Sequence, residues 1–106
     1  MIAVQEREAG YQDAIAAAAR LLGWRAVHFR PARTANGWRT PGQYDAVGWP
    51  DLILARPPRI VAIEVKRQGG KLTPEQSQWL ADLAACGIET HVAEPSDFDA
   101  IASILR

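Results

Sequence analysis

Apolar positions along this chain follow two different periods, and the change from one to the other separates helices from strands. Between residues 6 and 22, apolar residues recur every three or four positions within a run of alanines, which predicts an amphipathic helix. Gly23 is a natural helix stop. Residues 24–29 then alternate weakly between apolar and polar, and this period predicts a first strand.

The centre of the chain contains two short runs of aliphatic and β-branched residues, 50–55 and 60–66, which are typical of buried strands. The Arg56-Pro57-Pro58-Arg59 segment between them suggests a wide hairpin. Residues 31–49 have no clear period and contain two prolines and three glycines, so they are expected to form a loop. A loop of this length in so small a domain is usually functional or disordered.

The rest of the chain is expected to form a helix, a strand and a further helix. Thr73, Pro74 and Gln76 occupy the positions of an N-cap, a first helical residue and the third residue of a capping box. The helix that they open carries an apolar stripe and is expected to end at Gly87. Residues 88–93 are apolar enough to form the final strand.

A last helix, with Ser96 as its expected cap, completes the order α-β-β-β-α-β-α. The third and fourth strands flank a crossover helix, so they are expected to be parallel with a right-handed connection. The second and third strands are expected to pair as an antiparallel hairpin. The 106 residues, 1–106, therefore predict one α/β domain with a mixed four-stranded sheet and helices on its faces.

The net charge is zero, but the charges are segregated along the chain. Residues 20–71 contain ten basic residues against three acidic ones, a net charge of +7, whereas residues 72–106 have a net charge of −5. Such segregation favours a local basic surface that attracts nucleic acid, with ordinary solvated charge as the alternative. No apolar run approaches the roughly 20 residues of a membrane span, and the N-terminus lacks a signal-peptide pattern, so a cytoplasmic location is expected.

Charged residues interrupt the two central strands. Asp51 stands at the start of the first strand, and Glu64 and Lys66 point to one face of the second because side chains alternate. If the strands pair as a hairpin, all three lie at the end away from the turn. Two carboxylates there suit Mg²⁺ or Mn²⁺, and Lys66 can orient or deprotonate a water that hydrolyses a phosphodiester. An aspartate at a turn plus a cross-sheet Glu–Lys ion pair is the alternative.

The pattern Pro50-Asp51 followed by Glu64-Val65-Lys66 resembles the PD-(D/E)XK nuclease signature. Longer blocks resemble the VRR-NUC family within that superfamily, in order and in content. These blocks are Gly48-x-Pro50-Asp51-Leu52, Ile63-Glu64-Val65-Lys66, Gly70-Lys71-Leu72-Thr73-Pro74-Glu75-Gln76-x-x-Trp79-Leu80, and, in the opening helix, Glu8-x-x-Tyr11-Gln12 and Leu22-Gly23-Trp24. The resemblance covers nearly the whole chain.

The resemblance implies a restriction-endonuclease-like core and a metal-dependent DNA endonuclease. Small stand-alone members of the family, many of them from phages, tend to be homodimers and are associated with the cutting of branched DNA such as Holliday junctions. A homodimer in the cytoplasm of a bacterium or of a phage-infected host cell is therefore expected. A dimer also agrees with the need for two sites to cut two strands.

By the same resemblance, the metal ligands are Asp51, Glu64 and the backbone carbonyl of Val65, and Lys66 serves the attacking water. Glu8 is expected to complete the acidic cluster or to bind a second metal ion, although an acid in a first helical turn also suits the helix dipole. Gln76 is expected to support the site from the next helix, although a capping box explains the same residue without catalysis.

Five basic residues are expected to contact DNA phosphates. Three lie in or beside the long loop and two flank the active strand: Arg30, Arg33, Arg39, Arg67 and Lys71. Ordinary solvated charge is the alternative for each of them. For the whole chain, the alternatives are a non-catalytic DNA-binding module that retains the nuclease fold and a protein–protein interaction module. The presence of Asp51, Glu64 and Lys66 together favours the enzyme.

Overall fold

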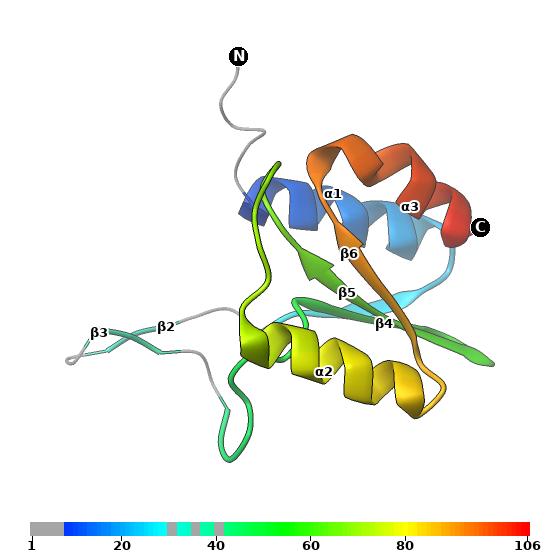
Figure 1. Ribbon diagram of the computed structural model, residues 1–106. Helices are drawn as coiled ribbons and strands as arrows, with labels where there is room; N and C mark the ends of the chain where they lie inside the picture. Colours follow the sequence, from blue (N-terminus) through cyan, green and yellow to red (C-terminus); the bar gives the residue numbers. More distant parts are fainter. Residues whose placement is uncertain (1–7, 30–31, 35–36, 40–41) are drawn as a thin grey trace.

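In the computed structural model, one mixed sheet of four strands lies between helices on its two faces (Figure 1). The structure describes residues 8–29, 32–34, 37–39 and 42–106, with side chains described for 10–29 and 42–106. The sheet has the order β1-β4-β5-β6, and β2 and β3 form a separate pair. The elements are α1 (Glu8–Leu21), β1 (Arg25–Val27), β2 (Ala32–Thr34), β3 (Gly37–Arg39), β4 (Leu52–Arg56), β5 (Arg59–Val65), α2 (Pro74–Ala85), β6 (Glu89–Ala93), η2 (Pro95–Asp97) and α3 (Phe98–Ile104).

The sheet topology agrees with the sequence prediction. Strands β4 and β5 are antiparallel, β5 and β6 are parallel, and α2 makes the crossover between the parallel pair. The edge strand β1 pairs antiparallel with β4. The α/β fold and the mixed four-stranded sheet are therefore confirmed.

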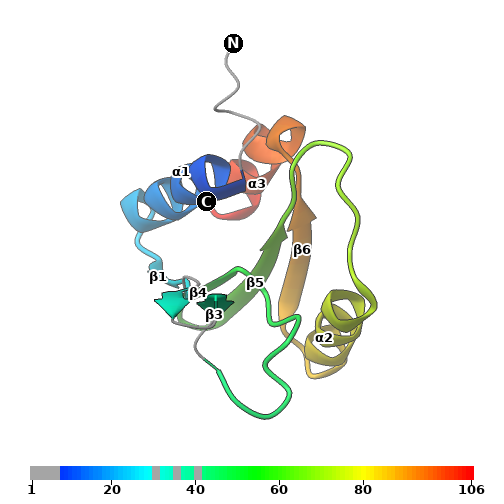
Figure 2. The ribbon, with the colours of Figure 1, turned by 90° about the vertical axis from the view of Figure 1, so that its left-hand side faces the viewer.

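The hydrophobic core lies between this sheet and the pair of helices α1 and α3 (Figure 2). Val61, Ile63 and Val65 of β5 belong to the core cluster, and each is completely buried. Since side chains alternate along a strand, Ala62 and Glu64 point to the opposite face, on which α2 lies. This alternation turns Glu64 away from the main core.

Three local predictions are wrong. The Pro57-Pro58 turn is tight, because Arg56 and Arg59 pair directly across it. Proline has a fixed φ and no N–H to leave unpaired, so two of them can close a two-residue turn. Residues 31–49 are not loop throughout, because β2 and β3 pair as a hairpin that projects from the main sheet (Figure 1). This pairing uses backbone groups and leaves no hydrophobic period in the sequence.

Ser96 does not cap the last helix. It lies inside η2, a turn in which the backbone N–H of Glu94 donates to Asp97 Oδ2 at 2.9 Å. Asp97 is the N-cap residue of α3. Serine and aspartate both favour helix starts, so the local signal alone did not distinguish these two neighbours. Within the described residues, no helix is long and apolar enough to cross a membrane.

Candidate active site

The open end of the β4–β5 hairpin brings together Asp51, Glu64 and Lys66. The backbone N–H of Val65 donates to Asp51 Oδ2 at 2.8 Å. The last ladder pair is Leu52 with Ile63, so one further step along the register puts Asp51 opposite Glu64. Residues directly opposite in an antiparallel pair share a face and are neighbours. The register therefore brings Asp51 and Glu64 to opposite positions at the open end of the hairpin.

The Glu64 side chain is only 2% exposed, although it is a carboxylate. Lys66 Nζ lies 3.7 Å from Glu64 Oε2, and the lysine side chain is itself mostly buried. A buried carboxylate is costly unless cations or hydrogen bonds compensate it. Lys66 provides part of that compensation, and a divalent cation bound at this place would add to it.

The donor set at this end fits a hard divalent cation. Asp51 and Glu64 supply carboxylate oxygens, and oxygen ligands with completing waters are what Mg²⁺ and Mn²⁺ take. Among the residues whose side chains are described, no group of three His, Cys, Asp or Glu residues surrounds one point. A third protein ligand at this end would therefore be a backbone carbonyl, an amide or hydroxyl oxygen, or a side chain outside the described set.

Asp51 is held in place by a loop that packs on the first turn of α2. A Cβ at Gly48 would lie 2.6 Å from the backbone carbon of Glu75 and 2.8 Å from the nitrogen of Gln76, and its φ is +88°. Only glycine accepts both this approach and this conformation. Gly48 therefore lets the Pro50-Asp51 segment reach the sheet close to the start of α2.

Two tryptophans fix the same loop. Trp79 Nε1 donates to the backbone oxygen of Asp45 at 2.9 Å. The rings of Trp49 and Trp79 meet edge to face, with their centroids 5.0 Å apart and their planes at 85°. Such pairs are favourable beyond simple burial. Trp79 thus anchors both halves of the loop that leads to Asp51.

His28 holds Asp51 from the other side. Its Nδ1 lies 2.7 Å from the backbone oxygen of Asp51, and since a carbonyl only accepts, Nδ1 carries the proton. No role for His28 at the site is expected from the sequence alone. The contact joins positions 23 residues apart, and no motif in the sequence links them.

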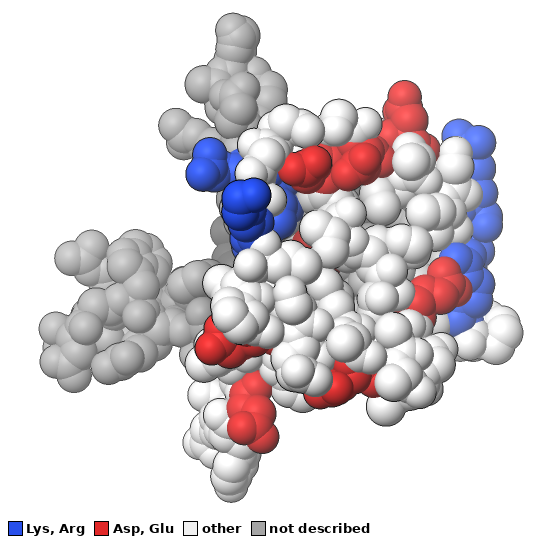
Figure 3. All heavy atoms as spheres, in the orientation of Figure 1, with Lys and Arg blue, Asp and Glu red and all other residues white. Residues whose placement is uncertain are grey.

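The connection between β5 and α2 carries Lys66, Arg67 and Lys71. The backbone N–H of Lys66 donates to Ala93 O at 2.9 Å, and that of Gly69 donates to a Glu94 carboxylate oxygen at 2.7 Å. These bonds tie the connection to the end of β6. Arg67 and Lys71 are exposed, and Figure 3 shows basic atoms gathered beside this connection.

Gln76 completes the predicted capping box. Its Oε1 accepts from the backbone N–H of Thr73 at 2.9 Å, and its own N–H donates to Thr73 Oγ1 at 3.1 Å. This confirms the structural reading of Gln76. A further role at the site stays a prediction.

Four predicted residues lie wholly or partly outside the described part of the chain. Glu8 is the first residue of α1, and Arg33 and Arg39 lie on β2 and β3, but their side chains fall outside the description. Arg30 lies outside the described residues altogether. Figures 1 and 2 both place the first turn of α1 beside the C-terminal end of β5.

Tyr11 and Gln12, from the opening block, are buried on α1. The Tyr11 ring packs against Phe98 with centroids 6.3 Å apart. Burial raises the pKa of the Tyr11 hydroxyl to about 12, and the charges of Asp97 and Glu94 act in the same direction. Tyr11 therefore stays neutral and belongs to the packing between α1 and α3.

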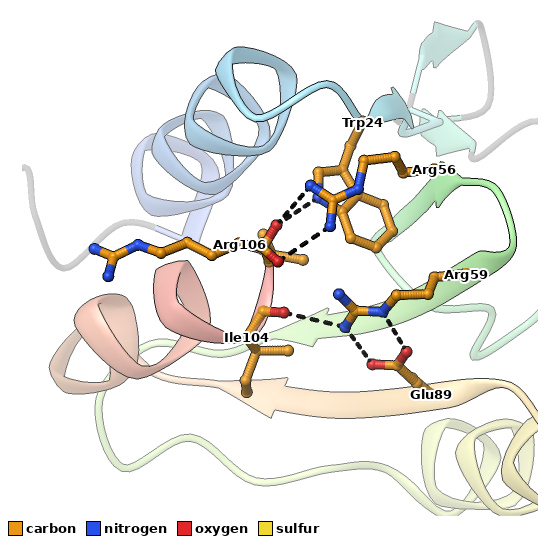
Figure 4. Close-up of polar contacts among 7 residues, drawn as sticks. Trp24, Arg56, Arg59, Glu89, Ile104 and Arg106 are labelled. Carbon is orange, nitrogen blue, oxygen red and sulfur yellow. Dashed lines mark hydrogen bonds and ion pairs between the residues drawn. The ribbon is translucent and has the colours of Figure 1, made fainter.

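Two of the basic residues counted over 20–71 lie at the other end of the hairpin, around Trp24 (Figure 4). The Arg56 guanidinium donates to the backbone oxygens of Leu22 at 2.9 Å, Leu105 at 3.1 Å and Arg106 at 3.1 Å. It lies 4.6 Å from the centroid of the Trp24 ring, and Trp24 Nε1 also donates to Leu105 O at 2.8 Å.

Arg59 binds Glu89 through two hydrogen bonds of 2.8 and 2.7 Å and also donates to Ile104 O at 3.0 Å. These bonds lower the pKa of the Glu89 carboxyl below its ordinary value. Together Arg56 and Arg59 satisfy carbonyls at the C-terminal ends of α1 and α3, which helices leave without partners. They are structural groups and not part of the candidate site.

Comparison with known proteins agrees with this fold. The family model of the VRR-NUC domain matches residues 12–97. A solved structure described as a VRR-NUC domain superposes with a TM-score of 0.65 over 91% of this chain and 94% of that chain, at 21% sequence identity. At that identity the superposition shows the shared fold. No curated protein matches the chain.

Proposed function

The chain belongs to the VRR-NUC family of nuclease-type domains, and on that premise we propose that it is a Mg²⁺- or Mn²⁺-dependent DNA endonuclease that hydrolyses phosphodiester bonds. One observation carries the proposal: Asp51 is bonded to the backbone beside Glu64, and Lys66 lies 3.7 Å from the same glutamate. A carboxylate pair with an adjacent ammonium group is the arrangement that this chemistry needs.

The metal ligands in this proposal are Asp51, Glu64, the backbone carbonyl of Val65 and, from the first turn of α1, Glu8. Asp51 Oδ2 already accepts from Val65 N–H, which orients the carboxylate before any ion binds. When bound, a divalent cation offsets the charge of the scissile phosphate and lowers the pKa of a water molecule.

Lys66 orients the attacking water in this mechanism. Its ammonium group donates hydrogen bonds to water or phosphate oxygen and stabilises the negative charge that develops on the phosphate. Water attacks phosphorus while the bond to the leaving oxygen breaks, and a strand with a nick results. Glu64 holds the ammonium group near this point, since the two lie 3.7 Å apart.

Exposed cations beside the site guide the DNA. Arg67 and Lys71 are exposed on the connection that also carries Lys66. Arg30, Arg33 and Arg39 are proposed to extend this track along the β2–β3 hairpin. Contacts of this kind are made mainly to phosphates and weaken as salt increases.

We further propose a homodimer that acts on branched DNA such as a Holliday junction. One chain of 106 residues provides one such site, and two symmetry-related sites are needed to cut two strands. Gln76 is proposed to support the site from the first turn of α2, which packs against Gly48 in the loop before Asp51.

A nicking assay tests the proposal. Supercoiled plasmid is incubated with the protein and Mn²⁺, with EDTA added to a matched sample, and Asp51→Ala is compared with the wild type. Nicking by the wild type alone, lost with EDTA, is the expected result. Retention of plasmid by both proteins with no cleavage by either would identify a DNA-binding module and overturn the enzymatic proposal.

The same assay on labelled substrates tests the finer proposal. Junction, flap and linear duplex DNA are compared at equal protein concentration with Mg²⁺ and with Mn²⁺. Preferential cutting of the junction is expected, and equal cutting of all three would contradict selectivity for branches.

A further inference from the structure

An exposed aromatic ring stands on the loop that leads to Asp51. Tyr44 is 96% exposed, and Val47 and Trp49 on the same loop are 73% and 38% exposed. Aromatic side chains gain most from burial, so a ring left almost fully in water contributes little to folding. Several exposed apolar residues on one short loop are a feature of binding surfaces.

The backbone at Tyr44 adds a second local cost. Its φ is +60°, in the left-handed region that residues with a Cβ rarely adopt, and Tyr44 is the one such residue other than glycine within the described chain. A glycine there would relieve the backbone and remove the exposed apolar ring. Neither property of Tyr44 is explained by the stability of the loop. Unfavourable conformations of this type concentrate at functional positions.

The loop presents the Tyr44 ring from a fixed base. The carbonyl of Asp45, the next residue, accepts from Trp79, and Trp49 packs edge to face on the same tryptophan. Gly48 packs on the first turn of α2. A side chain with two rotatable bonds on an anchored loop loses little entropy when it binds a ligand.

We propose that Tyr44 is a stacking site for an unpaired nucleobase of the DNA substrate. The inference rests on the proposed function and deepens it, because it names an unpaired base at the branch point, beside the cleavage point, as the feature of branched DNA that the protein recognises. Bases inside a duplex are already stacked on both sides, whereas a splayed base offers a free face to an aromatic ring.

The position of the loop agrees with this ligand. Tyr44 precedes Asp51 by seven residues, so the two Cα atoms are at most about 25 Å apart, which corresponds to about seven stacked nucleotides. The exposed Arg67 and Lys71 lie on the connection that carries Lys66 at the same end, and they favour a polyanion. A DNA strand at the Asp51 end of the hairpin can therefore reach the ring.

The test measures binding without cleavage. DNA with 2-aminopurine at one unpaired position, and the same sequence fully paired, are titrated with protein in EDTA. Tyr44→Gly removes the ring and relieves the backbone, Tyr44→Phe keeps a stacking ring, and Leu21→Ala, at an 89% exposed position at the end of α1, is the control for lost apolar area.

Tyr44→Gly is expected to weaken binding of the unpaired substrate about tenfold and to abolish quenching of 2-aminopurine. Its binding of the paired duplex and its melting temperature should not fall. Tyr44→Phe and Leu21→Ala should behave as the wild type.

Equal affinity of Tyr44→Gly and the wild type for the unpaired substrate would overturn the inference. An equal loss on paired DNA would also overturn it, as would a changed oligomeric mass, which would assign the ring to a contact between chains. Because no step requires cleavage, a chain that stacks bases but never nicks plasmid would refute the proposed function alone.

Discussion

The two ends of the β4–β5 hairpin both carry charged side chains, but the charges have different partners. At the turn, Arg56 donates to three backbone carbonyls and Arg59 to Glu89 and Ile104 O. At the open end, about 17 Å away along the strands, Asp51 accepts from the backbone N–H of Val65, and Glu64 lies 3.7 Å from the Lys66 ammonium group.

At the turn end, the charged groups bind only partners within the described part of the chain and have a structural role. The guanidinium groups of Arg56 and Arg59 lie over the Trp24 ring, 4.6 and 5.0 Å from its centroid. Their N–H groups donate to carbonyls at the C-terminal ends of helices (Figure 4). Fork-shaped guanidinium groups suit this use because they bind several oxygens at once. The positive charges of Arg56 and Arg59 are therefore accounted for by contacts within the protein, without a bound ligand.

The open end is arranged differently. Glu64 is almost fully buried and lies on the face away from the main core, and Asp51 is fixed through its own backbone and carboxylate. The comparison teaches that charged residues of one hairpin can either bind the ends of helices or lie near one another at the open end with their positions held by the backbone. Four variants test this distinction between the two ends.

Lys66→Met should have the largest effect. It keeps the apolar stem and removes the ammonium group, so the cleavage rate is expected to fall about 10²- to 10⁴-fold. Because the apolar stem still packs at this place, the fold should survive. The neighbouring Arg67→Met is the control and should weaken DNA binding without a comparable loss of rate at saturating DNA. Cleavage by Lys66→Met at the wild-type rate would remove Lys66 from the mechanism.

Arg56→Met should act on stability instead. It breaks hydrogen bonds from a charged group to carbonyls of Leu22 and Leu105, and the free energy of unfolding should fall by about 2 kcal/mol. Chemical denaturation measures this loss, and cleavage below the unfolding transition should be unchanged. Arg25→Met, an exposed change on β1, is the control. An Arg56→Met protein that is stable but inactive would place this end in the active site.

His28→Ala should lower cleavage about tenfold by loosening Asp51, whose backbone oxygen His28 binds. The diagnostic readout is the Mn²⁺ concentration for half-maximal rate, which should rise, and His28→Gln should restore it in part by donating an N–H. His91→Gln changes the other histidine and should leave the Mn²⁺ requirement unchanged. A purely structural His28 would lower stability with no change in that requirement.

Glu89→Gln should have the smallest effect, visible in the pH dependence of stability. Hydrogen bonds from Arg59 lower the pKa of Glu89, so the unfolded chain binds the proton more readily than the folded one. The contribution of this pair is present above the ordinary carboxyl pKa and is lost as the pH falls through the lowered value. The stability difference between wild type and variant should therefore shrink from about pH 7 to about pH 3. A difference that stays constant would contradict the assigned pKa shift.

Much of the framework could be predicted from local patterns. Two aliphatic runs gave β4 and β5, the capping box of Thr73 and Gln76 gave the start of α2, and a crossover helix required β5 and β6 to be parallel. Alternation along β5 placed Glu64 and Lys66 on one side. These features depend on residues that are close in sequence, so local patterns are enough to predict them.

What could not be predicted depends on contacts between distant residues. Arg56 meets Leu105 across 49 positions, and His28 meets Asp51 across 23. The tight Pro57-Pro58 turn follows from the register of the β4–β5 ladder. The β2–β3 pair forms through backbone hydrogen bonds, and its residues show no apolar period in the sequence. Gly48 appeared in the sequence only as part of a motif, and its close approach to Glu75 supplied the reason.

The central claim is that Asp51 and Glu64 together hold a divalent cation that DNA cleavage requires. Asp51→Asn tests it most directly, because an amide oxygen can still accept from Val65 N–H while the negative charge is lost. Mn²⁺ binding, followed by electron paramagnetic resonance, and plasmid nicking are measured on the same samples. The account predicts that Asp51→Asn melts like the wild type but neither binds Mn²⁺ at this site nor nicks the plasmid. Wild-type Mn²⁺ binding and nicking by Asp51→Asn would contradict it.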